Sequence, residues 1–221
     1  MRWSEIPIHV VDFEGSRETG IVEYGVVSLA GGRIAAVSTR LCRPRAKLTA
    51  EDTRVHGLRT PDVAEADPFD AAWEQFAALR ASGVFAAHFS GTENALLRAV
   101  WPCSRLSPDF LHPGRESSEW GPWIDTGRLA SAVLPRGASA ALADVIAHLG
   151  LVDRLAQHAQ QWCPAQRCRY HCALYDALAA ALVLEHLARE ADGSAWSLAR
   201  VVAASVGDRE RRDDLVQGRL F

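Results

Sequence analysis

The first part of the chain has apolar patterns that predict three strands. Residues 6–13 form a nearly continuous apolar run with β-branched residues, and the run ends at Glu14 and Gly15. This arrangement is typical of a buried strand that leads into a turn. Residues 21–29 and 33–41 are two more candidate strands, and the Ala-Gly-Gly sequence between them favours a hairpin because glycine adopts positive φ at low cost. The three segments therefore predict an antiparallel meander.

The rest of the chain alternates between short apolar runs and helical spacing. The short runs predict two further strands, at residues 84–88 and 123–126. The stretch 103–121 is rich in Pro, Ser, Gly and charged residues, which predicts an exposed connection. Apolar residues recur at helical spacing in five segments, namely residues 68–81, 92–101, 138–149, 172–189 and 197–204.

Length and charge narrow the class of protein. With 221 residues, of which 48% are hydrophobic, the chain can bury one substantial core, so we expect one large domain. The formal net charge is −3, so contact with nucleic acid would need a local basic patch. A domain that only binds DNA is therefore a weaker expectation.

Membrane and secretory segments are not expected from the sequence. Glu5 and Asp12 precede any long apolar run, and no run approaches the ~18 apolar residues that a membrane span needs. We therefore expect a cytoplasmic protein with no membrane partner. The five cysteines are then expected to be reduced thiols.

Asp12 and Glu14 form a candidate metal-binding pair. They lie two residues apart at the end of the first predicted strand, so the period of a strand projects both carboxylates to one face. Such a pair suits a hard divalent cation, because burying a carboxylate is costly unless it is paired or bound to a metal. Turn-capping acids are the alternative interpretation.

Asp176, in the predicted helix at 172–189, and His171, directly before it, are further candidates. Asp176 interrupts an alanine- and leucine-rich pattern, so it needs a cation or a hydrogen-bond partner there. His171, expected at the first turn of this helix, is suited to act as a general base because imidazole titrates near neutral pH.

Five segments resemble, in the same order, the motifs of the DEDDh group of 3′–5′ exonucleases. Any one match would be weak, but five in the family's order are strong evidence, and the resemblance spans residues 6–190. The matching segments are residues 10–16 (V-V-D-F-E-G-S, like the first motif), 56–58 (H-G-L, like the H-G-I element), 87–97 (the second motif), 125–130 (D-T-x-x-L-A) and 171–177 (H-x-A-x-x-D-A, the third motif).

The resemblance implies a fold and a domain organisation. The family fold is α/β and ribonuclease H-like, with a five-stranded mixed sheet, its first three strands antiparallel, and helices on both faces. It implies an exonuclease domain at 1–190, followed by a helical extension and tail at 191–221 packed on the same domain. The charged stretch 208–214 is either a solvated end or an oligomer contact, so a homodimer is one expectation.

The resemblance also implies two-metal hydrolysis of nucleic acid from the 3′ end, with release of nucleoside 5′-monophosphates. Two Mg²⁺ or Mn²⁺ ions about 4 Å apart would clamp the attacking water and the leaving oxygen. Asp12 would bridge the ions, Glu14 and Asp176 would hold the ion that binds the water, and Glu93 would hold the second. His171 would take the proton from that water.

Substrate contacts are implied for residues around the first two motifs and the H-G-I element. His56 would touch a phosphate or sugar and Leu58 would wedge against a base, whereas a turn histidine and a core leucine are the alternative interpretation. Phe13, Gly15 and His88 complete the expected substrate-binding set.

The second motif departs from the family pattern. The family reads A-H-N-x-x-F-D, whereas residues 87–93 read A-H-F-S-G-T-E. Phe89 replaces the asparagine, Thr92 the phenylalanine and Glu93 the aspartate. Glu93 keeps the charge on a side chain one methylene longer. The alternative is an ordinary acid at a helix start, favoured by the helix dipole, and the site would then lack one carboxylate.

Two rival interpretations follow from the same residues. A zinc module is conceivable because three cysteines, at 163, 168 and 172, lie close in sequence to His171. It would leave Asp12, Glu14 and Asp176 unexplained.

The second rival is a nucleic-acid-binding domain that kept the fold and lost catalysis, because fold does not guarantee function.

Overall fold

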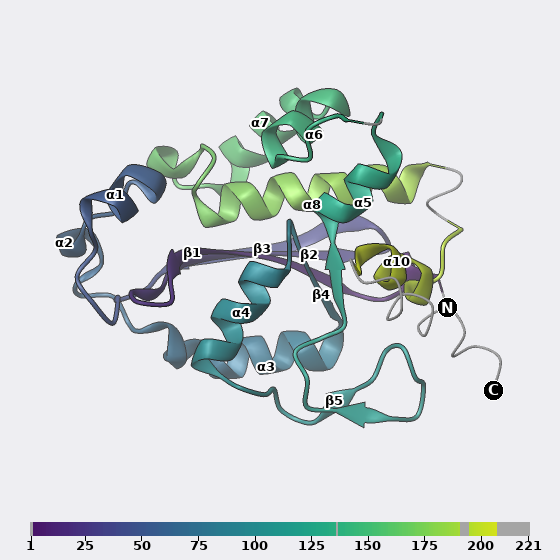
Figure 1. Cartoon of the computed structure of the whole chain (residues 1–221), viewed down its shortest axis with the longest axis horizontal. Helices are drawn as coiled ribbons and strands as arrows, with labels where there is room; N and C mark the ends of the chain where they lie inside the picture. Colours follow the sequence, from purple (N-terminus) through teal and green to yellow (C-terminus); the bar gives the residue numbers. More distant parts are fainter. Residues whose placement is uncertain (1, 136, 191–194, 207–221) are drawn as a thin grey trace.

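A five-stranded mixed sheet forms the centre of the computed structural model, which describes residues 2–135, 137–190 and 195–206 (Figure 1). The strand order is β3-β2-β1-β4-β7. The first three strands are antiparallel, β4 runs parallel to β1, and β7 runs parallel to β4. The predicted five-stranded mixed sheet is confirmed. Its strands are β1 (Ile8–Ser16), β2 (Gly20–Ala30), β3 (Arg33–Leu41), β4 (Val84–Ala87) and β7 (Trp123–Asp125).

Helices cover both faces of the sheet (Figure 1). The alternation along β1 creates the two faces, because Ile8 and Val10 join the cluster around α8, while Val11 and Phe13 join the other cluster. Small α1 and α2 lie at one end of the sheet. One face carries α5 (Thr126–Val133), α6 (Leu142–His148), α7 (Val152–Trp162) and α8 (Ala173–Arg189), the other carries α3 (Trp73–Ser82) and α4 (Gly91–Val100), and the end helices are α1 (Ala50–His56) and α2 (Thr60–Val63).

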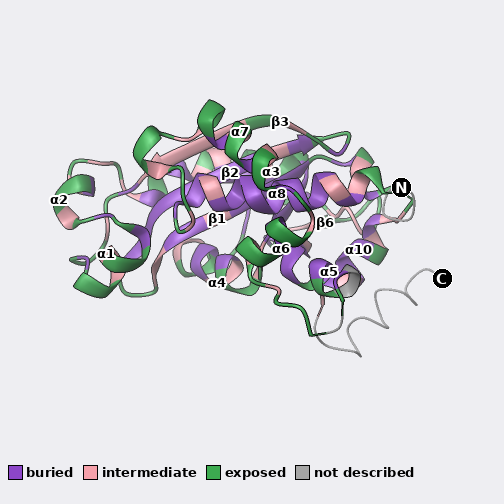
Figure 2. Ribbon diagram, turned by 90° about the horizontal axis from the view of Figure 1, so that it is seen from above, coloured by how far each residue is buried: buried purple, intermediate pink, exposed green. Residues whose placement is uncertain are grey.

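The first turn of α8 packs directly against β2. A Cβ atom on Gly25 would lie 2.4 Å from the backbone of Ala173 and of Leu174, so only glycine permits this approach. Figure 2 shows α8 as a largely buried helix beside the sheet, and its alanines let it lie close. This packing places the N-terminal turn of α8 beside β1, the strand that carries Asp12 and Glu14.

Several elements differ from the sequence prediction. The pattern at 68–81 begins as a 3₁₀ turn, Phe69–Ala72, before α3 starts, and the connection 103–121 contains a small ribbon of β5 (Ser107–Pro108) and β6 (Glu116–Ser117). Helices α1, α2, α5 and α7 were not predicted. The first two have only seven and four residues, and α5 depends on a cap from Asp125, whose side chain accepts a hydrogen bond from Arg128 N, so periodicity alone does not identify them. Helix α7 has 11 residues, and its periodicity was overlooked.

Helix α10 (Leu198–Ser205) closes the far edge of the sheet. It packs against α5 and β7, and the hydroxyl of Ser205 accepts a hydrogen bond from Asp125 N at 2.9 Å. The rest of the expected extension, at 191–194 and 207–221, lies outside the described residues, as does the stretch 208–214 with its expected oligomer contact. Within the described chain, no helix is both long and apolar enough to cross a membrane.

Candidate active site

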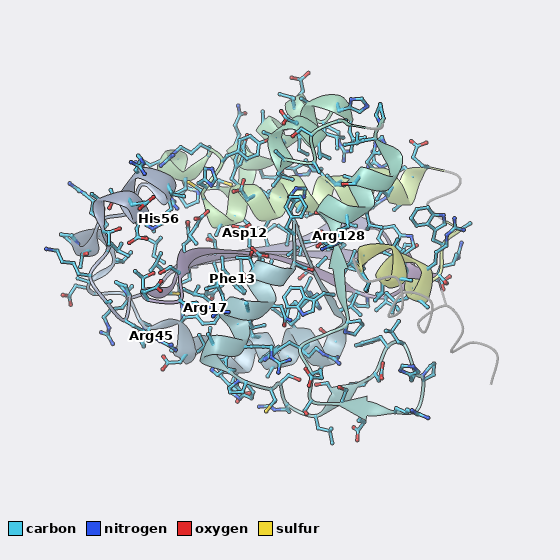
Figure 3. The ribbon with its side chains drawn as sticks, viewed as in Figure 1. Asp12, Phe13, Arg17, Arg45, His56 and Arg128 are labelled. Atoms are coloured by element: carbon cyan, nitrogen blue, oxygen red, sulfur yellow. The ribbon has the colours of Figure 1, made fainter. Side chains whose placement is uncertain are left out.

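Strand β1 directs Asp12 toward α8 (Figure 3). Ile8 and Val10 pack against α8, and the strand period places Asp12 and Glu14 on that same face. Glu14 is 8% exposed. The two carboxylates therefore extend the apolar row of β1 to the end of the strand, where α8 begins.

Asp176 meets this pair from the first turn of α8. It is buried, its Oδ2 accepts a hydrogen bond from the backbone N–H of His171 at 2.9 Å, and its Oδ1 has no hydrogen-bond partner. Ligand atoms of Glu14, His171 and Asp176 lie within 4.8 Å of one another. This spacing suits a shared cation.

His171 lies just before α8 and is exposed. Its φ is 61°, and Cys172 is the N-cap residue of the helix, so the expected position of His171 within the first turn is wrong. The left-handed conformation at His171 breaks the helical path. It leaves the imidazole next to Glu14 and Asp176 while the backbone N–H holds the Asp176 carboxylate.

Glu93 lies in the first turn of α4 and is 6% exposed. Burial raises its pKa to about 8, and the charge of Asp125 adds to the rise. Its Oε2 is buried without a hydrogen-bond partner. A buried carboxylate oxygen of this kind differs from the solvated acid that a simple helix start would show.

Burial and the charges of neighbouring carboxylates raise the pKa values of the cluster. Burial, followed by the charges of Asp176 and Glu14, holds the pKa of Asp12 well above its usual range. Burial and Asp176 raise the pKa of Glu14 to about 8, although Arg167 opposes the rise. Burial raises the pKa of Asp176 to about 7. The cluster is thus a place where protons or metal ions must balance buried negative charge.

Glu23 and Arg167 adjoin the site and were missed from the sequence. Glu23 stands opposite Glu14 in the β1–β2 register. It is buried, accepts hydrogen bonds from Arg167 Nε at 3.0 Å and from Ala173 N at 3.1 Å, and forms an ion pair with Arg167. The sequence feature that could have identified Glu23 is its position as an acidic residue within the apolar pattern of β2. The pair ties β2 to the start of α8.

Three side chains expected to bind substrate are buried in this structure. Phe13 packs edge-on against Phe69 in the aromatic cluster on the opposite face of the sheet. His56 is 2% exposed and its Nδ1 accepts a hydrogen bond from Leu58 N at 3.2 Å. Leu58 belongs to a small core cluster with Val22. The side chains of Phe13 and Leu58 therefore serve packing here, in line with the core-leucine alternative for Leu58.

Gly15 and His88 shape the backbone near the carboxylates. Gly15 has a φ of 134° at a bulge in β1, and a Cβ there would lie 2.1 Å from the oxygen of Gly20, so only glycine fits. His88 uses both ring nitrogens within the protein, one with Thr126 Oγ1 at 3.0 Å and one with Ala140 O at 2.8 Å. Its imidazole is therefore fixed in place.

No cysteine belongs to the group of candidate metal ligands found among the described residues. That group consists of Glu14, His171 and Asp176 and includes no cysteine. All five cysteines are free thiols, and Cys168 Sγ donates to the Pro164 carbonyl oxygen at 3.4 Å. His171 thus lies with carboxylates rather than in a sulfur-rich site.

Comparison with known proteins identifies the fold. No protein-family model and no curated protein matches the chain. Among solved structures, Exonuclease X in complex with 5′-overhanging duplex DNA matches with a TM-score of 0.61 and 19% identity, over 90% of this chain and 99% of that chain. The fold is that of the DEDDh exonucleases.

Other exonuclease-fold structures match with similar scores over part of their length. A 3′-exonuclease with 3′-end-specific recognition of a histone mRNA stem-loop has a TM-score of 0.56 and 18% identity, over 82% of this chain and 63% of that chain. E. coli Exonuclease I in complex with a dT13 oligonucleotide has a TM-score of 0.59 and 10% identity, over 83% of this chain and 41% of that chain. At these identities the likeness establishes the exonuclease fold and confirms the ribonuclease H-like architecture.

Proposed function

We propose that this chain is a metal-dependent 3′–5′ exonuclease that releases nucleoside 5′-monophosphates from nucleic acid. The observation that carries the proposal is the set of four carboxylates that three elements of an exonuclease fold contribute. Glu14, Glu93 and Asp176 are buried, and Asp12 is half-buried. The proposal assigns the exonuclease domain to residues 1–190 and a cytoplasmic location to the protein.

The residues present fit divalent cations. Asp176 Oδ1 and Glu93 Oε2 are buried oxygens without hydrogen-bond partners, and oxygen ligands suit Mg²⁺ and Mn²⁺. Asp12, Glu14 and Asp176 would hold one ion, and Asp12 with Glu93 would hold a second. Bound metal would supply Lewis-acid polarisation of the phosphodiester and a more acidic attacking water.

The protein groups around this cluster have separable roles. His171 is exposed beside Glu14 and Asp176, where its imidazole can accept a proton from an attacking water. The Glu23–Arg167 ion pair fixes the distance between β2 and α8, and so positions Asp176 against β1. The alternative, a binding domain without catalysis, is not favoured because all four carboxylates are present.

The test is an end-specific hydrolysis assay. Single strands labelled at the 5′ end are incubated with purified protein and Mn²⁺, with the 3′ end either free or chemically blocked. We expect a ladder that shortens from the free 3′ end and no ladder from the blocked strand. Equal degradation of both strands would indicate endonucleolytic or 5′-directed cleavage, and no degradation in Mn²⁺ or Mg²⁺ would contradict the proposal.

A further inference from the structure

Phe89 occupies the turn between β4 and α4 in a strained conformation. Its φ is 59°, in the left-handed region that asparagine and glycine adopt far more readily than an aromatic residue. Asparagine stands at this place in the exonuclease motif. The chain therefore holds a bulky ring on a backbone that a small polar residue would adopt with less strain.

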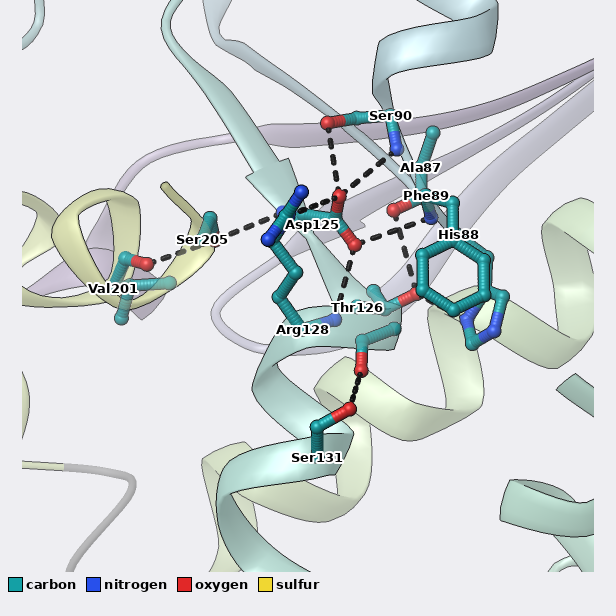
Figure 4. Close-up of polar contacts among 11 residues, drawn as sticks. Ala87, His88, Phe89, Ser90, Asp125, Thr126, Arg128, Ser131, Val201 and Ser205 are labelled. Atoms are coloured by element: carbon teal, nitrogen blue, oxygen red, sulfur yellow. Dashed lines mark hydrogen bonds and ion pairs between the residues drawn. The ribbon is translucent and has the colours of Figure 1, made fainter. Parts of the chain in front are cut away.

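Asp125 holds this turn in place (Figure 4). Its carboxylate accepts hydrogen bonds from the backbone N–H groups of Phe89 and Ser90, each at 3.1 Å. The same carboxylate caps α5 by accepting from Arg128 N at 3.1 Å. Asp125 is 3% exposed. Hydrogen bonds to Asp125, a residue of a different strand, therefore hold the turn in its conformation. A strained backbone persists in a folded protein only when surrounding contacts hold it in this way.

The ring of Phe89 is supported on one side and exposed on the other. A Cβ on Gly127 would lie 2.7 Å from Cε1 of the ring, so the ring rests against the backbone of α5. The ring also packs edge-on to His88, with 4.7 Å between centroids. Even so, Phe89 is 47% exposed. The strained conformation therefore buries little of the Phe89 ring. It holds the ring in place with about half of the residue's surface exposed to solvent.

This surface stands beside the carboxylate cluster. In the parallel register of β1 and β4, Val10 pairs with Ala86. Continuing this register by two residues places His88 at the level of Asp12, and Phe89 is the next residue. Helix α4, whose first turn carries Glu93, begins two residues after Phe89. A strand whose 3′ end reached the carboxylates would pass the ring.

We propose that Phe89 is a stacking platform for an unpaired base within the last three nucleotides of the 3′ end. This inference rests on the proposed exonuclease function and names single-stranded 3′ ends as the substrate class. Base–aromatic stacking contributes roughly 5- to 150-fold to binding and tolerates any base, because every base has a π-face. Arg128 pairs with Asp125 through Nε at 3.5 Å, and its side chain is 49% exposed, so its guanidinium could also contact a neighbouring phosphate.

Binding and stability distinguish stacking from a structural role. We would measure the anisotropy of a 5′-labelled ten-nucleotide single strand in Ca²⁺, for the wild type, Phe89→Leu and Phe89→Asn, and the melting temperature of each protein. We expect both variants to bind roughly 5- to 150-fold more weakly. Phe89→Asn should melt no lower than the wild type because asparagine relieves the strain. Leu106→Ala, at an apolar residue that is 60% exposed on another segment, is the matched control and should bind normally.

Strands with one abasic site locate the stacked base. With abasic sites placed singly at the last three positions, we expect the wild type and Phe89→Leu to bind one of these strands equally. Equal penalties for Phe89→Leu on every strand, unchanged binding by both variants, or no binding of any strand by the wild type would overturn the inference. Cleavage in Mn²⁺ is scored separately, so a protein that stacks bases without hydrolysing strands would refute only the exonuclease proposal.

Discussion

Glu93 is the residue at which the second motif departs from the exonuclease pattern. Because its buried Oε2 has no protein partner, we expect Glu93→Gln to keep the side-chain volume and weaken metal binding. Hydrolysis should fall by at least the roughly 10–100-fold that loss of a hydrogen-bond partner of a metal ligand causes, because Glu93 would itself be a ligand. Mn²⁺ should rescue it better than Mg²⁺, which requires near-ideal octahedral geometry. The measurement is cleavage rate against metal concentration, and an unchanged curve would remove Glu93 from the site.

His171 offers a separate prediction at the residue scale. Its exposed imidazole lies beside Glu14 and Asp176, so His171→Ala should lower the cleavage rate by about 10²–10⁴-fold with little change in strand binding. The same change at His148, an exposed histidine at the end of α6, is the control. If His171→Ala cleaves at the wild-type rate, the general-base assignment is wrong. If it binds strands poorly, the histidine serves binding.

The Glu23–Arg167 pair joins two elements, β2 and the segment that leads into α8. Both side chains are largely buried, so Arg167→Met would leave Glu23 as an uncompensated charge, which we expect to cost about 3–5 kcal/mol. The measurement is the free energy of unfolding in urea.

The exposed Arg59–Asp62 pair gives a matched control for Arg167→Met. Arg59→Met should leave the free energy of unfolding nearly unchanged, because exposed ion pairs contribute little to stability. Adding Glu23→Gln to Arg167→Met should recover part of the loss. Equal effects of Arg167→Met and Arg59→Met would show that the buried pair contributes nothing particular.

The elements show how far the sequence could be interpreted. Strands β1 to β3 followed from apolar runs and from the two glycines of the hairpin, and α8 followed from its long periodic pattern. Helix α5 could not be predicted in this way, because its start depends on Asp125. The Asp125 carboxylate accepts one hydrogen bond from Arg128 N, which caps the helix, and a second from Phe89 N in the turn after β4. That second contact joins residues 36 positions apart.

In the candidate site, too, some residues could be predicted from local sequence and others depend on long-range contacts. The motifs pointed to Asp12, Glu14, Glu93, Asp176 and His171 because local spacing and resemblance carry that information. The ion pair of Glu23 with Arg167 spans 144 positions and becomes visible only when β2 pairs with β1 and α8 packs on Gly25. Likewise, the opposite orientation of Phe13 follows from the strand alternation combined with the position of α3.

The whole molecule should respond to pH through its carboxylate cluster. Burial raises the pKa of Glu14 and of Glu93 to about 8 and that of Asp176 to about 7, so the folded state binds protons that the unfolded state releases above about pH 4. These bound protons increase the free energy of unfolding at low pH, and this contribution is lost as the pH rises toward 8. The metal-free protein should therefore melt at a higher temperature near pH 5.5 than near pH 8.5.

Saturating Mn²⁺ should flatten this dependence, because bound cations replace the protons. The measurement is melting temperature against pH in chelator and in Mn²⁺. A metal-free protein that grows more stable from pH 5.5 to 8.5 would show that other titrating groups dominate the pH response.

The most direct test of the central claim, that the buried carboxylates form a metal site, is the melting temperature at pH 7.5 with and without Mn²⁺. Asp12→Asn and Asp176→Asn relieve repulsion between buried carboxylates. We expect each variant to melt above the wild type in chelator and to respond little to Mn²⁺. The wild type should gain stability as Mn²⁺ rises, because the ion binds the folded state. A wild type indifferent to Mn²⁺, or variants that are less stable in chelator yet still respond to Mn²⁺, would contradict the account.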